Sequence, residues 1–246
     1  MIDFAQEGAV ATLTASDFAP LGRGDCEFAN RLRDAVRHAA DEDSVKAIVI
    51  RASGGNFALP PTPDDLRAAA RVREGRRQAW HAAFCAPSGL YQNLAYCKKF
   101  TVTAVRGLCA GAGGMLVLCT DHTVCATQSS FEEPFSTLPE SSLVLAALTL
   151  RLNRAKSWML GGAPWDTKQA LHAGLVNHAV DAAQVDAHAL AAAQAAAKMP
   201  LDGVAMTKLL FEAYLDTQGV GQDFDMAGMH ADALQRALHA TPGERA

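Results

Sequence analysis

The sequence contains no long apolar run, because no stretch approaches about 18 residues without a charged residue or a turn former. It also begins with nothing that looks like a signal peptide. The 22 basic and 26 acidic residues leave a net charge of -4, without the basic excess that nucleic acids or anionic membranes attract. We therefore expect a cytoplasmic protein whose partners include neither nucleic acid nor a membrane.

Motifs of several common chemistries are missing as well. The six cysteines form no C-x-x-C pair and stand mostly in apolar or helical contexts, which predicts free buried thiols instead of disulfides or zinc ligands. No G-x-S-x-G, S-x-x-K or H-E-x-x-H motif occurs, so the best-known serine hydrolase, β-lactamase and zinc protease signatures are absent. The sequence thus predicts no metal site.

What is present fits one core of enzyme size, since half of the 246 residues are hydrophobic. Strand-like runs over 10–14 and 46–51 flank a helix whose apolar residues recur on one face from Phe28 to Ala39. Strand, helix and strand in this order predict a parallel sheet. The chain ends in alanine-rich and amphipathic helices, so we expect an α/β core over 1–181 and a C-terminal helical region over 182–246.

The segment after residue 61 predicts the start of another helix. Thr62 can cap it, Pro63 suits its first position, and two aspartates occupy its first turn. We expect this helix to continue through the charged segment 67–80. The four arginines between Arg71 and Arg77 form either a solvated face or an edge that faces phosphates, and we favour the solvated face. A later helix is expected to begin with Thr167 as its cap.

The most distinctive stretch follows a β-branched run at 101–105. Four glycines within 107–114 precede the apolar run 115–119, an order that predicts a strand, a tight loop and a buried helix. N–H groups at such a helix start can stabilise an anion or a polarised carbonyl. The glycines could instead serve a tight strand–helix crossing. A dinucleotide fingerprint is disfavoured, because its third glycine position falls on Leu116 and the next strand-like run arrives too soon.

These residues resemble the crotonase superfamily, the enoyl-coenzyme A hydratases and isomerases. The likeness is carried by AVRGLCAGAGG and LVLCTD before His122, by FEEPFSTLPESS from Phe131, and by RAKSWMLGG and ALHAGLVNHAV between Arg154 and Val180. The resemblance implies a spiral of ββα units with C-terminal helices that assemble homotrimers, or homohexamers built from two trimers. It also implies an acyl-coenzyme A substrate and no separate cofactor.

The resemblance further implies an oxyanion hole, in which two backbone N–H groups bind the thioester oxygen. One donor falls on Ala112. The other falls on Pro61, and proline has no N–H, so either Thr62 or Leu59 donates instead or this half of the hole is missing. The residues expected to lie against the substrate are Phe57, Gly111, Gly113, Met115 and Phe135.

The catalytic carboxylates of the family are only partly matched. Its hydratases carry two glutamates, and the corresponding positions here are Met115 and Phe135, so the usual activation of water lacks a base and an acid. Glu140 matches the glutamate of Δ3-Δ2-enoyl-coenzyme A isomerases of the peroxisomal type when two or three residues are deleted before Pro139. Glu140 is therefore the predicted catalytic residue, and an off-site surface glutamate is the alternative.

Glu132, Glu133 and His122 are weaker candidates, which we interpret as surface or core residues. The sequence predicts an acyl-coenzyme A-processing enzyme, either a double-bond isomerase or a hydratase-like enzyme that forms a stabilised enolate. The alternative is a crotonase-fold protein without chemistry that serves as a binding or assembly subunit. The missing glutamates and the Pro60-Pro61 pair favour this alternative, whereas the intact glycine loop favours the enzyme.

Overall fold

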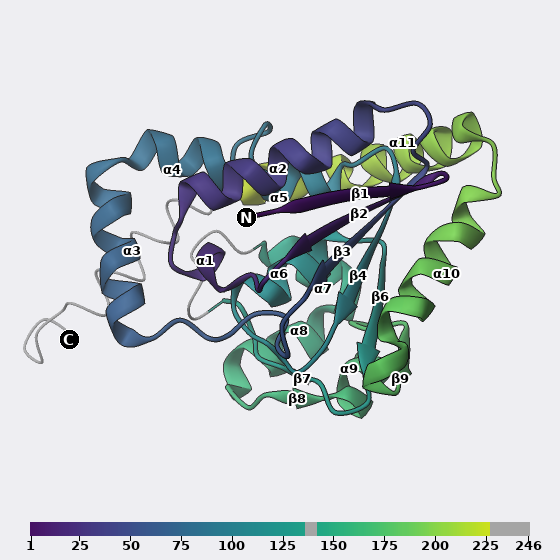
Figure 1. The fold of residues 1–246 in the computed structure, drawn as a ribbon. Helices are drawn as coiled ribbons and strands as arrows, with labels where there is room; N and C mark the ends of the chain where they lie inside the picture. The colour runs from purple at the N-terminus through teal and green to yellow at the C-terminus, as the bar shows by residue number, and fades with distance from the viewer. Residues whose placement is uncertain (136–141, 227–246) are drawn as a thin grey trace, which may run out of the picture.

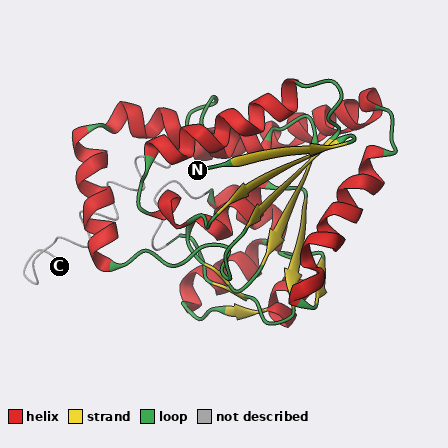
Figure 2. Ribbon diagram, viewed as in Figure 1, coloured by secondary structure: helices red, strands yellow, loops and turns green. Residues whose placement is uncertain are grey.

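The computed structural model describes residues 1–135 and 142–226, and two sheets organise them (Figures 1 and 2). The larger sheet has the strand order β1-β2-β3-β4-β6-β9, and the smaller has the order β5-β7-β8. The strands of the larger sheet are β1 (Asp3–Glu7), β2 (Val10–Ala15), β3 (Ala47–Ala52), β4 (Phe100–Val105), β6 (His122–Ala126) and β9 (His178–Val180). Those of the smaller sheet are β5 (Leu108–Cys109), β7 (Ser130–Phe131) and β8 (Trp165–Asp166).

The strands from β2 to β9 are mutually parallel in the larger sheet, as the strand–helix–strand pattern predicts. β1 instead pairs with β2 as an antiparallel hairpin, which the strand–helix–strand pattern does not predict. The turn between them contains Gly8 at a φ of 57°, a conformation that glycine adopts without steric cost. The Gly8-Ala9 pair between two short runs is the signal that could have identified this hairpin.

Helices lie on both faces of the larger sheet. They are α1 (Ala19–Gly22), α2 (Cys26–Asp41), α3 (Pro63–Gly75), α4 (Arg77–Phe84), α5 (Leu90–Ala95), α6 (Ala112–Cys119), α7 (Leu143–Leu150), α8 (Leu152–Gly161), α9 (Thr167–Ala173), the 3-10 turn η1 (Ala182–Gln184), α10 (Val185–Ala197) and α11 (Leu201–Thr217). The main core joins α2, α5 and α6 to one face of the sheet. On the other face, α10 contributes Val185, Ala189 and Ala193 to a second core cluster with the strands (Figure 1). The α/β class predicted from the sequence is confirmed.

α2 forms where the apolar periodicity places it. Asp25 caps its N-terminus by accepting hydrogen bonds from the N–H groups of Glu27 and Phe28. The apolar residues of the predicted face are all buried in the core: Phe28, Leu32, Val36 and Ala39. Burial of this stripe holds the helix on the sheet.

α3 begins as predicted, with a capping box in which Asp65 N–H donates to Thr62 Oγ1 and Thr62 N–H donates to the Asp65 carboxylate. The expected continuation through residue 80 is wrong, because α3 ends at Gly75 and a new helix starts at Arg77. Arg76 between them has a φ of -139°, outside the helical range, and the glycine before it has low helix propensity.

The arginines of this segment are not all solvated. Arg71, Arg76 and Arg77 are exposed, as the favoured interpretation requires. Arg73 is buried, and its guanidinium carbon lies 5.1 Å from the ring centroid of Trp80. The break after Gly75 allows α4 to bring this tryptophan under Arg73, so a cation–π contact stabilises the corner between the two helices.

The cap of α9 also differs from the prediction. Asp166, one residue earlier, is the N-cap, and its carboxylate accepts the N–H of Gln169 at 2.7 Å. Thr167 is buried, and its hydroxyl lies 3.0 Å from both the Ala126 and the Ser129 carbonyl oxygens. Thr167 therefore connects α9 to the end of β6 instead of capping the helix.

The six cysteines are free thiols, and all except Cys26 are buried. Burial raises the pKa of Cys109, the cysteine of the glycine-rich loop, with smaller contributions from Cys125 and Glu132, so this thiol stays protonated and is a poor nucleophile. Within residues 1–135 and 142–226 there is no metal-ligating cluster of histidine, cysteine and acidic residues. In the same ranges no helix has the length and apolar character that spanning a bilayer requires.

Candidate active site

The glycine-rich loop follows the carboxyl end of β4 and packs against the segment that follows β3. Gly107 has a φ of 57°, and a Cβ built on it would lie 2.3 Å from the Gly55 carbonyl oxygen. The Asn56 side chain accepts a hydrogen bond from the Leu108 N–H at 2.9 Å. Only glycine fits at this crossing, because any side chain at residue 107 would overlap the segment after β3. The absence of a side chain there lets the two loops lie in contact.

Beyond this crossing the two loops run parallel and are joined by a β-bridge between Ala58 and Cys109. Phe57 N–H donates to the Arg106 carbonyl at 2.8 Å, and Ala58 N–H donates to the Leu108 carbonyl at 3.0 Å. Ala110 N–H returns a bond to the Ala58 carbonyl at 3.1 Å. The loops after β3 and β4 are thereby fixed side by side at the carboxyl ends of parallel strands, the usual location of ligand sites in such sheets.

α6 starts at the end of this pairing. Gly111 precedes it with a φ of 48°, and Ala112 occupies the first helical position. Among the described residues no group accepts the N–H of Ala112, which is expected at the first turn of a helix. An anion or a thioester oxygen placed there would receive this hydrogen bond and the positive end of the helix dipole.

Gly113 has a packing role that needs no ligand. A Cβ built on it would lie 2.7 Å from the Ala58 Cβ and 3.2 Å from a ring carbon of Phe57. Phe57 is itself fully buried, and its ring is tilted by 44° against the ring of Phe18, with centroids 4.8 Å apart. The glycine therefore lets α6 approach the loop after β3, and the side chain of Phe57 lies in the core. Contact of Phe57 or Gly113 with a substrate stays a prediction.

Apolar side chains occupy both positions where the resemblance places glutamates. Met115, in the first turns of α6, is fully buried. Phe135 is half-buried and lies edge-on to the Trp158 ring, with centroids 6.3 Å apart, and Trp158 stacks on Trp165 at 4.7 Å. A Cβ on Gly114 would lie 3.4 Å from Pro134, which places this aromatic segment directly against α6.

The loop after β3 contains one candidate for the second oxyanion donor. Pro60 and Pro61 have no N–H, and the Thr62 N–H is bonded at 2.9 Å to the Asp65 carboxylate in the capping box. Leu59 N–H has no acceptor among the described residues. Of the alternatives that the sequence left open, Thr62 is thus already engaged and Leu59 is available.

Glu140, the predicted catalytic residue, lies in the segment 136–141, outside the described residues. The weaker candidates Glu132 and Glu133 lie within the described residues. Glu132 and Glu133 are both half-buried, and the Glu133 carboxylate accepts the Phe135 N–H at 2.6 Å. Glu133 thus stabilises the turn that leads away from β7, in agreement with a structural role.

α6 is about 12 Å long at 1.5 Å per residue, and His122 follows its far end as the first residue of β6. Its ring packs near Phe100 and His178, at centroid distances of 6.1 and 5.2 Å. Burial, and then the neighbouring His178, lower the pKa of His122. The position favours the interpretation of His122 as a partly buried structural residue.

Solved structures show the same fold. The chain superimposes on an enoyl-CoA hydratase from Bacillus halodurans with a TM-score of 0.80 at 18% identity, over 95% of this chain and 94% of that one. An enoyl-CoA hydratase/isomerase from Xanthobacter autotrophicus Py2 gives 0.75 at 25% identity, over 99% and 89%. An enoyl-CoA hydratase from Polaromonas sp. JS666 gives 0.72 at 24% identity, over 98% and 93%. The architecture is therefore the crotonase-like α/β fold that the sequence predicts.

The sequence model of the enoyl-CoA hydratase/isomerase family matches residues 25–239. The chain belongs to this family, as its glycine-rich loop and the segments downstream of it indicate. A search of curated protein sequences finds no significant match.

Proposed function

We propose that this chain binds an acyl-coenzyme A thioester and moves a double bond along its acyl chain, as an enoyl-coenzyme A isomerase. The observation that carries the proposal is the start of α6, where the Ala112 N–H has no acceptor among the described residues. A thioester oxygen at this position would gain electron density when a neighbouring carbon loses a proton. The hydrogen bond and the helix dipole would stabilise that charge.

Isomerisation suits the apolar surroundings better than hydration does. Hydration requires groups that activate water and protonate carbon, and Met115 and Phe135 stand where the family's hydratases carry those groups. Isomerisation requires one mobile carboxylate. In the proposed reaction Glu140 removes a proton from C2 of a 3-enoyl thioester, the electrons move into the dienolate, and the same proton returns at C4.

The test is turnover of a 3-enoyl-coenzyme A, followed by the absorbance of the conjugated 2-enoyl product. Glu140→Gln keeps the shape of the side chain and removes the proton carrier, so we expect turnover to fall about a hundredfold or more. Calorimetry should show substrate affinity within about twofold of wild type. Glu132→Gln is the matched control and should retain most of the activity. If Glu140→Gln is as active as wild type, the base lies elsewhere.

We also propose self-association through α11, as a homotrimer or homohexamer. Leu210 and Phe211 of this helix are 72% and 62% exposed, and Met206, Leu209 and Tyr214 are also exposed. Several large apolar side chains exposed on one helix are typical of a protein interface. Location in the cytoplasm is part of the same proposal, supported by six cysteines without a disulfide.

A further inference from the structure

A single carboxylate in the first turn of α10 joins two arginines of the sheet. Asp186 Oδ1 lies 2.8 Å from Arg106 Nη2, and Asp186 Oδ2 lies 3.0 Å from Arg51 Nη1. The side chains of Arg106 and Asp186 are 22% and 36% exposed, so solvent screens this cluster only in part. Each oxygen of the carboxylate is thus ion-paired with a different arginine, and the contact with Arg51 is also a hydrogen bond.

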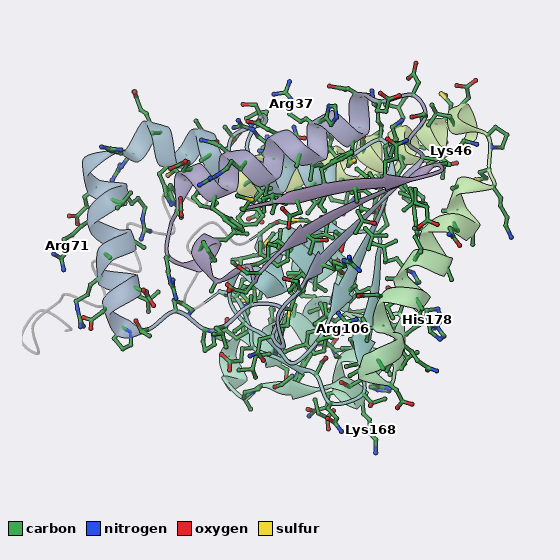
Figure 3. All side chains as sticks on the ribbon, viewed as in Figure 1. Arg37, Lys46, Arg71, Arg106, Lys168 and His178 are labelled. Atoms are coloured by element: carbon green, nitrogen blue, oxygen red, sulfur yellow. The ribbon has the colours of Figure 1, made fainter. Side chains whose placement is uncertain are left out.

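The two arginines belong to neighbouring parallel strands at their carboxyl ends. Arg51 is the penultimate residue of β3, and its Nε donates to Thr14 Oγ1 of β2 at 3.0 Å. Arg106 directly follows β4, and its Nε donates to the Ala182 carbonyl at 3.0 Å. Asp186 therefore ties the ends of β3 and β4 to the start of α10. Figure 3 shows Arg106 at this end of the sheet.

The main chain of Arg106 belongs to the loop pairing described above. Its carbonyl accepts the Phe57 N–H at 2.8 Å, and the next residue is Gly107, which crosses the loop after β3. Only five residues separate Arg106 from Ala112. The guanidinium of Arg106 contacts Asp186 of α10 and the Ala182 carbonyl. The main-chain carbonyl of Arg106 binds the loop that follows β3.

We propose that Asp186 is a positioning residue that acts through Arg106 to fix the glycine-rich loop, and with it the orientation of the Ala112 N–H. Without the carboxylate, two guanidinium groups would face each other without a counter-charge, and Arg106 would turn toward solvent. The end of β4 would then lose an anchor on the C-terminal helices. The catalytic consequence rests on the function proposed above, whereas the structural link does not.

The test compares Asp186→Asn with Asp121→Asn. Asp121 is a matched control, because its carboxylate also joins strand to helix: it accepts the Thr101 N–H at 2.8 Å and pairs with Lys208 of α11, at the amino end of β4. We expect Asp186→Asn to lower kcat for a 3-enoyl-coenzyme A about 10- to 100-fold, since small misplacements of a catalytic group have effects of this size. KM should change less than about threefold. Asp186→Glu should restore most of kcat.

Hydrogen exchange of the substrate-free protein gives a second readout that needs no catalysis. In Asp186→Asn, peptides covering 106–112 should exchange faster than in wild type, whereas Asp121→Asn should leave them unchanged even where its melting temperature falls further. Unchanged exchange in Asp186→Asn would overturn the proposal, as would equal losses of kcat in both variants. If the wild-type protein is inactive on every enoyl thioester, only the proposed function is refuted. Hydrogen exchange of peptides 106–112 would still show whether Asp186 fixes the glycine-rich loop through Arg106.

Discussion

Ala112→Pro would remove the proposed oxyanion donor while preserving the helix that presents it. Proline lacks an N–H, and it is well tolerated at the first position of a helix, where Ala112 stands. No described residue accepts the Ala112 N–H, so the variant loses no internal hydrogen bond there. We therefore expect the free energy of unfolding to change by less than about 1 kcal/mol.

The effect on turnover should be large by comparison. Loss of one oxyanion donor in a water-excluded site lowers kcat about 10²- to 10³-fold, equivalent to about 2.7–4 kcal/mol. The upper part of this range is expected here, because Pro60 and Pro61 leave Leu59 as the single candidate for the other donor in the loop 57–62. No further N–H of this loop could take over the hydrogen bond that Ala112 loses, because the Thr62 N–H is bonded to Asp65.

The assay is turnover of a 3-enoyl-coenzyme A by wild type, Ala112→Pro and the control Ala112→Gly, with melting curves for all three. Ala112→Gly keeps the N–H and should keep most of the activity. If Ala112→Pro is folded, binds the thioester and retains more than about a third of wild-type kcat, the N–H of Ala112 does not stabilise the transition state. The placement of the site at the start of α6 would then be wrong.

Three further results are expected. Gly113→Val should destabilise the fold by about 1–3 kcal/mol in urea titrations, because its Cβ would overlap that of Ala58; unchanged stability would show that the loops can separate. Burial lowers the pKa of His122 below its ordinary value of 6.5, so the unfolded chain binds more protons below that pH and stability should fall as pH decreases. In His122→Asn this decrease should be smaller, as melting curves at several pH values would show. Leu210→Asp combined with Phe211→Asp should convert an oligomer to monomers in light scattering, and a monomeric wild type would contradict assembly through α11.

Features that depend on neighbours along the chain were predictable from the sequence. The capping box at Thr62, the buried stripe of α2 and the parallel strands follow from local hydrogen bonding and hydrophobic periodicity. The glycine-rich loop before α6 was recognisable for the same reason: a run of glycines followed by an apolar segment has few other structures available. Family membership also rests on such contiguous segments.

The tertiary structure decided which of these residues act on one another. The sequence alone could not assign Gly113 to packing, since the atom that excludes a side chain there belongs to Ala58, 55 positions earlier. It could not show that Thr62 N–H is occupied, nor that Asp186 reaches Arg51 and Arg106 across the sheet. Local patterns fix the elements because their interactions span a few residues. The site depends on contacts between loops far apart in the chain, and only the packing of the elements brings those loops together.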